Sequence, residues 1–202
     1  MIAIINNNMG NIKSVSRALD LLGAENIITS DVNEIKQASK LILPGVGNFA
    51  EASRRLRQSG LMDLIKSEAL DNKKPLLGIC LGMQLLFDKS YEDGENEGLG
   101  LIPGMVKSLS DRPHKLAVPH MGWNDLKVKE SRLLKGIPTG ECFYFVHSFE
   151  AKCDSKYISA TTEYGEDVVA AVEHDNIYGV QFHPEKSQAS GIQLIKTFVT
   201  IC

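Results

Sequence analysis

The sequence has few cysteines and no long apolar segment, and these shortages exclude several classes of protein. Its four cysteines are widely separated and form no CxxC pair, which disfavours a disulfide scaffold and a zinc knuckle. The longest apolar stretch, Pro75 to Phe87, is too short to span a bilayer and contains two glycines and a glutamine. The chain is therefore expected to be a protein of a reduced, cytoplasmic compartment, with no membrane segment.

An excess of basic residues is also lacking, since 22 Lys and Arg stand against 25 Asp and Glu, for a net charge of −3. Proteins that bind nucleic acid mainly through phosphates need clustered Lys and Arg, so nucleic acid is not expected as a partner. A signal peptide carries basic residues before its apolar segment. Here the apolar Ile2 to Ile5 comes first and the earliest basic residue is Lys13, which argues against such a peptide.

The first half of the chain alternates short apolar runs with amphipathic stretches. Four strands are expected, at 2–5, 26–29, 41–43 and 76–79. Helices are expected between them, at 11–22, 31–38, 49–71 with a break near Gly60, and 81–87. This alternation predicts a parallel sheet with helices on both faces.

After Gly94 the pattern changes to short alternating strands separated by turns. They are expected to be antiparallel and appended to the parallel sheet, at 105–109, 142–146, 157–161, 168–173 and 177–181. An amphipathic helix over 192–199 follows. No repeat or linker interrupts the chain, so the fold class expected is α/β: an open, mostly parallel sheet with helices on both faces plus appended antiparallel strands, in one domain over residues 1–202.

Cys80 lies between an expected strand and an expected helix, in the segment GICLGMQ. A nucleophile at such a tight turn needs small neighbours, and Gly78 and Gly82 provide them. The free N–H groups at the start of the helix favour a thiolate over a thiol. The alternative is a free cysteine packed at the end of a strand, and the spacing alone leaves both open.

A nucleophilic cysteine needs a base and a group that orients the base. His183 and Glu185 lie two residues apart at the end of another expected strand, so their side chains point to the same side. Glu185 can accept from one imidazole nitrogen while the other faces a thiol. Taken alone, the pair is equally compatible with a histidine beside a solvated carboxylate.

The segment Pro44-Gly45-Val46-Gly47 follows the third expected strand. Its two glycines allow the backbone to turn an N–H towards a neighbouring cavity. Together with the N–H of Leu81, it could form an oxyanion hole. The alternative is an ordinary loop, because the segment matches neither a P-loop nor a dinucleotide-binding fingerprint.

Three segments, PGVGNFAEA, GICLGMQLLF and GVQFHPEKS, together resemble the oxyanion strand, nucleophile elbow and His–Glu segment of class I glutamine amidotransferases, in the same order. The resemblance runs over nearly the whole chain. The segments INNNMGNIKSV, GLGLIPG, PHMGWN, YFVHS and TTEYG are most similar to the glutaminase subunits of imidazole glycerol phosphate synthases.

The resemblance implies a catalytic triad of Cys80, His183 and Glu185 that hydrolyses glutamine to glutamate and ammonia through a thioester. It implies an oxyanion hole at Val46 and Leu81, flanked by Gly45 and Gly47. Substrate contacts are implied for four residues: Gln84, Glu92 (with the α-amino group), His147 and Ser148 (with the carboxylate). No metal or organic cofactor is implied. Phe149 and Tyr91 depart from the family, which commonly has tyrosine and an acidic residue there.

The resemblance also implies a partner, since the family docks the glutaminase on a cyclase subunit, a (β/α)₈ barrel, which receives the ammonia in histidine biosynthesis. The residues matching that interface of a heterodimer are Asn11, Trp123, Tyr144 and Lys186. Trp123 could instead be a core anchor, Tyr144 a strand aromatic and Lys186 a solvated charge.

Three alternatives remain from the sequence. One is a glutaminase that supplies ammonia to a different synthase, for example in surface-sugar assembly. Another is a non-catalytic regulatory relative, which the complete triad disfavours. The third is a cysteine peptidase or hydrolase of similar fold, which the PHMGWN and HPEKS segments disfavour.

Overall fold

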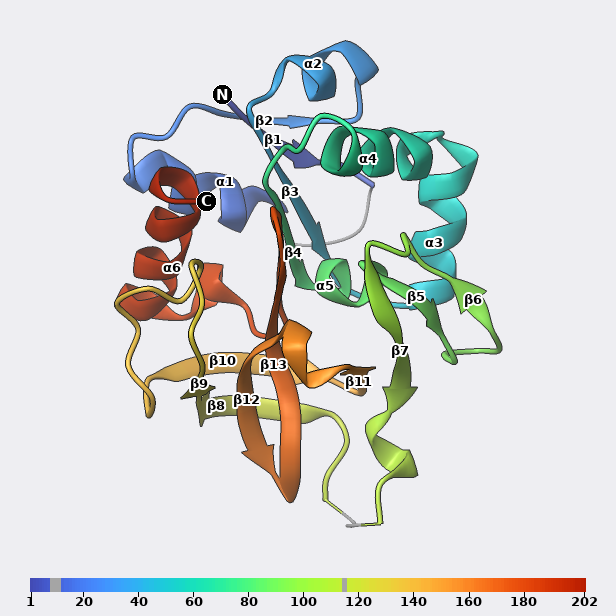
Figure 1. Ribbon diagram of the computed structural model, residues 1–202, viewed down its shortest axis with the longest axis vertical. Coiled ribbons are helices and arrows are strands. Elements are labelled where there is room, and N and C mark those ends of the chain that lie inside the picture. The colour runs from blue at the N-terminus through green and yellow to red at the C-terminus, as the bar shows by residue number, and fades with distance from the viewer. Residues whose placement is uncertain (8–11, 114–115) are drawn as a thin grey trace.

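The computed structural model describes residues 1–7, 12–113 and 116–202. An eight-stranded sheet forms its centre, in the order β2-β1-β3-β4-β14-β13-β12-β9 (Figure 1). The strands of this sheet, in chain order, are β1 (Ile2–Ile5), β2 (Asn26–Thr29), β3 (Lys40–Gly45), β4 (Leu76–Cys80), β9 (Lys127–Val128), β12 (Ile158–Tyr164), β13 (Glu166–His174) and β14 (Ile177–Val180). The strands from β2 to β14 are parallel, and β13, β12 and β9 continue the sheet antiparallel.

Two smaller sheets lie outside the central one. The first pairs β8 (His120–Asp125) with β10 (Cys142–His147), antiparallel. The second has the order β11-β7-β5-β6, formed by β5 (Phe87–Ser90), β6 (Asn96–Glu97), β7 (Ile102–Ser108) and β11 (Phe149–Cys153). Because β10 leads directly into β11, residues 147–149 connect the two small sheets, in the lower half of the view in Figure 1.

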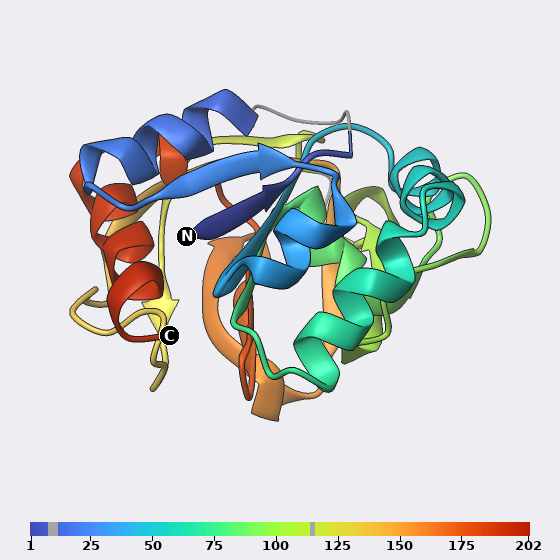
Figure 2. The ribbon, with the colours of Figure 1, turned by 90° about the horizontal axis from the view of Figure 1, so that it is seen from above.

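Helices cover both faces of the central sheet (Figure 2). One face carries α1 (Ile12–Leu21) and α6 (Gln188–Thr200), which contact each other. The other face carries α2 (Val32–Gln37), α3 (Phe49–Gln58), α4 (Leu61–Leu70) and α5 (Leu81–Leu85). Short 3₁₀ helices lie at η1 (Leu109–Asp111), η2 (Ser155–Tyr157) and η3 (Pro184–Lys186).

The alternation of side chains in β1 shows how the sheet divides the core. Ala3 and Ile5 pack into the cluster beneath α3 and α4, whereas Ile2 and Ile4 pack into the cluster beneath α1 and α6. All four side chains are buried, as expected for a strand covered on both faces.

Local capping signals explain where several helices begin and end. The Asp31 carboxylate accepts hydrogen bonds from the N–H groups of Asn33 and Glu34 at the start of α2. Asn48 caps α3 in the same way. Gly60 adopts φ 75° between α3 and α4, which confirms the predicted break near this residue.

The α/β class with a mostly parallel sheet is confirmed, but several details of the prediction are wrong. Strand β3 continues through Pro44 and Gly45 instead of ending before them. The helix expected over 81–87 ends at Leu85, and Phe87 begins β5. The helix start expected at Asn11 lies outside the described residues.

Three strands expected to be antiparallel additions have other places. β14 pairs parallel with β4, so it belongs to the parallel part of the sheet. β7 and β10 belong to the two smaller sheets. The alternation within a strand indicates which side chains are buried, but it does not indicate which strand pairs with which.

Candidate active site

Cys80 lies at the point where β4 turns into α5, with the backbone at φ 55° and ψ −111°. A positive φ is uncommon for a residue with a side chain and has a cost in backbone strain. The two flanking glycines make the turn possible. A Cβ atom at Gly82 would lie 1.7 Å from the Leu43 carbonyl oxygen, and one at Gly78 would lie 2.6 Å from the Gly82 oxygen. The glycine spacing therefore has the steric cause that the sequence suggested.

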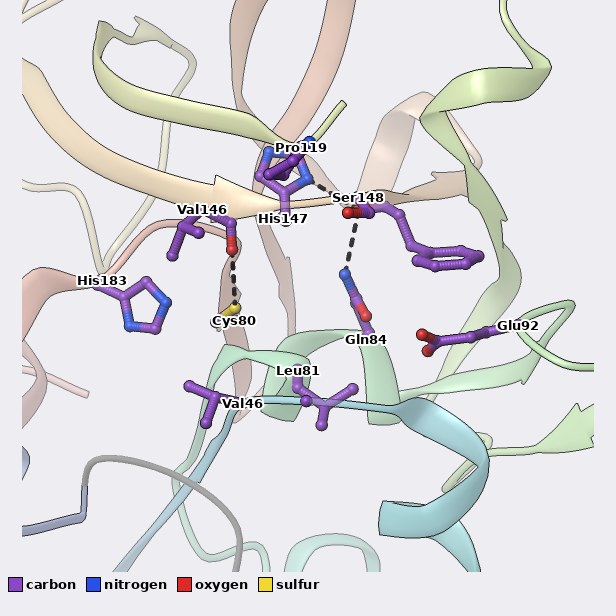
Figure 3. A pocket seen from close by; sticks show the side chains of 12 residues that line it. Val46, Cys80, Leu81, Gln84, Glu92, Pro119, Val146, His147, Ser148 and His183 are labelled. Carbon is purple, nitrogen blue, oxygen red and sulfur yellow. Dashed lines mark hydrogen bonds between the residues drawn. The ribbon is translucent and has the colours of Figure 1, made fainter. Parts of the chain in front are cut away.

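A cavity of about 270 Å³ opens beside this turn (Figure 3). It lies beyond the carboxyl ends of β3 and β4, where open α/β sheets commonly bind ligands. The residues that line it are Val46, Gly47, Cys80, Leu81, Gln84, Glu92, Pro119, Val146, His147, Ser148, Phe149 and His183. Its volume is slightly below the range of about 300–1,000 Å³ that is usual for small-molecule sites, and it suits a compact ligand.

His183 reaches the cavity from the segment after β14, next to β4 in the sheet. Its Nδ1 atom lies 2.8 Å from Glu185 Oε1, and both side chains are 2% exposed. The other ring nitrogen, Nε2, is buried and has no partner in hydrogen-bonding geometry among the described residues. Burial lowers the pKa of His183, but Cys80 and Glu185 outweigh it and raise the pKa to about 9. The structure thus brings Cys80, His183 and Glu185 together, with the imidazole favoured in its charged form.

The sulfur of Cys80 has two further neighbours. Gln181 Nε2 lies 3.8 Å away and the Val146 carbonyl oxygen lies 3.9 Å away. Gln181 is fully buried, and it was not among the site residues expected from the sequence. It directly follows β14 and lies two residues before His183, so the same segment brings both side chains to Cys80, a placement that no spacing in the sequence indicates.

Gln84, on α5, donates both of its amide hydrogens to protein acceptors. Its Nε2 atom lies 3.1 Å from the Phe149 carbonyl oxygen and 3.0 Å from Gln181 Oε1. The Phe149 oxygen can only accept, which fixes the orientation of the Gln84 amide. The remaining polar atom of the Gln84 side chain, its oxygen, is therefore available to a ligand in the cavity.

Glu92 borders the cavity on the side of Gln84, with its carboxylate directed inward (Figure 3). Its Oε2 atom accepts from the N–H of Phe49 at 2.7 Å, at the start of α3. Burial raises the pKa of Glu92, and the hydrogen bond from Phe49 opposes that change. The second carboxylate oxygen can meet a cationic group of a ligand.

The expected oxyanion strand lies next to Cys80. The cavity is lined there by Val46, Gly47 and Leu81, whereas Gly45 pairs with Cys80 in the β3–β4 ladder. Gly47 has φ 102°, a conformation that glycine adopts without strain. The structure therefore places the expected oxyanion strand next to the nucleophile.

Ser148, His147 and Phe149 also border the cavity. The His147 imidazole is hydrogen-bonded within the protein, with Nδ1 2.8 Å from the Phe149 carbonyl oxygen. The two departures from the family differ in position. Phe149 lines the cavity, whereas Tyr91 lies outside the lining and contacts Lys89 and Lys107 through its ring face.

Three of the four expected partner residues form one surface cluster. Trp123 and Tyr144 are cross-strand neighbours on β8 and β10, with ring centroids 6.2 Å apart. Lys186 Nζ lies 5.7 Å from the centroid of the Tyr144 ring. Trp123 is 50% exposed, so it is not a core anchor. Asn11 lies outside the described residues.

Met121 adds to this surface with 61% exposure, although it was not among the residues expected there from the sequence. It lies two residues before Trp123 on β8, so the strand alternation places both on the same face.

Within residues 1–7, 12–113 and 116–202, no group of three or more His, Cys, Asp and Glu side chains could hold a metal ion. In the same part of the chain, every helix is too short or too polar to cross a membrane.

The model of the glutamine amidotransferase class-I family matches residues 3–202. The chain therefore belongs to the class I glutamine amidotransferases, enzymes that use a cysteine nucleophile, and the resemblance drawn from the sequence is confirmed.

Its curated relatives carry a more specific name. The chain is 45% identical to imidazole glycerol phosphate synthase subunit HisH 1 of Campylobacter jejuni over 202 residues, covering 100% of both chains. It is 50% identical to subunit HisH of Listeria innocua, covering 98% of this chain and 94% of the relative. The HisH subunit of Sulfurimonas denitrificans is 48% identical, with 98% and 97% covered.

Solved structures share the fold at lower identity. A protein of Thermoplasma acidophilum, assigned to GMP synthase, has a TM-score of 0.74 at 22% identity, with 100% of this chain and 92% of that chain covered. The PurLQS structure from Thermotoga maritima has a TM-score of 0.73 at 19% identity, with 98% and 96% covered. These two likenesses support the fold alone.

Proposed function

We propose that this chain is the glutaminase subunit of an imidazole glycerol phosphate synthase and hydrolyses glutamine to glutamate and ammonia. One observation carries the proposal: Cys80 stands at a strained turn in a small cavity, beside the buried His183–Glu185 pair. The full-length similarity to HisH subunits supports the choice of complex. In that role the ammonia passes to a cyclase subunit, which makes imidazole glycerol phosphate in histidine biosynthesis in the cytoplasm.

In the first half of the reaction, the Cys80 sulfur attacks the side-chain amide carbon of glutamine. The carbonyl oxygen gains negative charge, and we assign the N–H groups of Val46 and Leu81, two residues that line the cavity, to hold it. His183 carries a proton at neutral pH, since its pKa is raised to about 9. It gives this proton to the departing NH₂ group, so the C–N bond breaks, ammonia leaves and a thioester remains.

In the second half, the neutral His183 takes a proton from water. The resulting hydroxide attacks the thioester carbon, the C–S bond breaks, and glutamate and the Cys80 thiolate are released. Glu185 accepts from Nδ1 throughout, which keeps the imidazole oriented and stabilises its charged form.

The remaining polar groups of the cavity fit the other parts of glutamine. We assign the α-amino group to the Glu92 carboxylate and the α-carboxylate to the backbone of His147 and Ser148, since all three residues line the cavity. The Gln84 oxygen can accept an N–H of the substrate amide. Phe149 contributes a carbonyl that holds Gln84, a role that does not depend on its side chain.

We assign the surface of Trp123, Tyr144, Lys186 and Met121 to the cyclase, a (β/α)₈ barrel, in a heterodimer. Exposed aromatic and methionine side chains are enriched where proteins associate. Lys186 would face an acidic group of the partner. Asn11 belongs to this assignment by the resemblance alone.

The test measures glutamate release from glutamine by the purified chain, alone and with the cyclase and its nucleotide substrate. Cys80→Ala should abolish the release. Cys153→Ala is the matched control, because burial raises the pKa of Cys153 to about 11 and keeps its thiol protonated. We expect the cyclase and its nucleotide to increase the rate of glutamate release. Cys80→Ala should show no release, and Cys153→Ala should release glutamate at the rate of the unmodified chain.

Two outcomes would overturn parts of the proposal. Activity that requires Cys80 but does not respond to the cyclase would indicate a glutaminase of another synthase. A folded chain that releases no glutamate under any of these conditions would contradict the glutaminase assignment itself.

A further inference from the structure

Two buried histidines form a hydrogen-bonded chain behind the cavity wall. His147 Nε2 lies 2.9 Å from His120 Nδ1, and His120 Nε2 lies 3.2 Å from Asn124 Nδ2. At the other end, His147 Nδ1 lies 2.8 Å from the Phe149 carbonyl oxygen. The proposed reaction has not used the His120 side chain, whose ring contacts are with Phe145, His147 and Tyr164.

The hydrogen-bond chain lies between two carbonyl oxygens, of Phe149 and Glu163, which can only accept. They fix the direction of every hydrogen bond between them. The Phe149 oxygen can only accept, so His147 carries its proton on Nδ1. A neutral His147 then accepts at Nε2, which places the His120 proton on Nδ1. Asn124 Nδ2 also donates to the Glu163 carbonyl oxygen at 2.8 Å, so the same NH₂ group donates to His120 Nε2.

This order requires both imidazoles to be neutral, because a proton added to either ring would set two donors against each other. Burial lowers the pKa of His120 to about 4 and that of His147 to about 3. The charges near His147, on His183 and Arg112, oppose its protonation as well. His120 is stacked between the rings of Phe145 and Tyr164, at centroid distances of 4.8 and 4.2 Å.

The hydrogen-bond chain ends on the Phe149 carbonyl oxygen, which also affects the geometry of the cavity. The Phe149 oxygen accepts from His147 Nδ1 and from Gln84 Nε2. Gln84 in turn bonds Gln181, whose Nε2 lies beside the Cys80 sulfur. A change in the His147 tautomer would remove one donor from the Phe149 carbonyl, and that carbonyl orients the Gln84 amide.

We propose that His120 is a positioning residue for glutamine binding: by donating to His147 Nε2, it fixes the His147 tautomer that holds the Phe149 carbonyl and, through it, Gln84. The proposal rests on the glutaminase function proposed above. His120 is not one of the residues that line the cavity, so its effect is on how the cavity is arranged.

The kinetic test compares His120→Phe with His120→Asn in the complex with the cyclase and its nucleotide. The Phe ring keeps the stack between Phe145 and Tyr164 but removes the donor. Its KM for glutamine should rise about tenfold, with a smaller change in kcat. His120→Asn places an amide N–H near the position of Nδ1 and should recover part of the loss. Tyr164→Phe, which keeps the stacked ring and removes only the hydrogen bond to Ala117, is the matched control.

The second measurement is independent of turnover, and its first part uses the unmodified chain, so that part does not depend on whether the variants fold. Imidazole ¹⁵N NMR of the unmodified chain should show His120 and His147 neutral at pH 7, each with its proton on Nδ1. In His120→Phe, the His147 signals should shift towards a mixture of tautomers. A proton on Nε2 of His147 in the unmodified chain, or an unchanged KM in folded His120→Phe, would overturn the proposal. A chain with the expected tautomers but no glutaminase activity would contradict the proposed function and leave the hydrogen-bond chain intact.

Discussion

At the scale of single residues, the Glu185 carboxylate affects the site by raising the pKa of the His183 imidazole. Its hydrogen bond to Nδ1 helps raise the pKa of His183 to about 9, so the imidazole holds a proton below that pH and loses it above. Because the first half of the proposed reaction needs that proton, kcat/KM for glutamine should fall as the pH rises through about 9. Steady-state rates from pH 6 to 10 test this expectation.

Glu185→Gln should move this alkaline limb to lower pH, since a neutral amide supports the imidazolium less than a carboxylate does. It should also lower the rate at least tenfold. Glu163→Gln is the control, because Glu163 is exposed and pairs with Lys127 away from the cavity. An alkaline limb at the same pH in Glu185→Gln would contradict the role given to this carboxylate.

At the scale of elements, the junction of β4 and α5 depends on a very close approach of two backbones. A Cβ atom at Gly82 would lie 1.7 Å from the Leu43 oxygen, so Gly82→Ala must push α5 away from β3. We expect a loss of about 3 kcal/mol or more in the free energy of unfolding. Chemical denaturation of the purified variant measures that loss.

Gly23→Ala is the matched control for this substitution. Gly23 has φ 66° and no atom within 4 Å of an added Cβ, so only backbone strain changes. Its cost should be about 1 kcal/mol. Equal losses in the two variants would show that the contact with Leu43 does not restrict this position.

Elements with local signals could be predicted from the sequence. The Asp31 cap set the start of α2, Gly60 divided α3 from α4, and the apolar runs located β1 and β2. Pairing between distant strands could not be predicted, because each strand pattern is compatible with several neighbours. The parallel position of β14 next to β4 is such a case.

The candidate site likewise combines features that short segments of sequence indicate with features that depend on contacts between distant segments. Glycines around Cys80 and the spacing of His183 and Glu185 are visible in short segments. That Cys80 and His183 share a cavity follows from the adjacency of β4 and β14, which only the structure and the family resemblance supply. Gln181 and His120 act through side-chain contacts between distant segments, and no short pattern records those contacts.

At the scale of the whole molecule, the surface around Trp123 lies near the end of the structure where the cavity is. Trp123→Ala should weaken the affinity for the cyclase about tenfold or more, because exposed tryptophans at interfaces contribute disproportionately to binding. Isothermal titration calorimetry with the purified cyclase measures the Kd.

Leu70→Ala is the control for that substitution. Leu70 is 45% exposed, close to the 50% of Trp123, and it ends α4 shortly before the first residue of β4, away from the cavity. Its Kd should equal that of the unmodified chain. An unchanged Kd for Trp123→Ala would mean that the cyclase binds elsewhere.

The fixed amide of Gln84 has a consequence for turnover. Both of its hydrogens are donated to Phe149 and Gln181, so the cavity receives an oxygen. In the function proposed here, the substrate amide brings an N–H to that oxygen, whereas the γ-carboxylate of glutamate at neutral pH brings only further oxygens. Hydrolysis thus replaces an attraction with a repulsion between like partial charges at the same atom. We therefore expect glutamate to bind in this cavity more weakly than glutamine, and to leave it as a result of the chemistry that forms it.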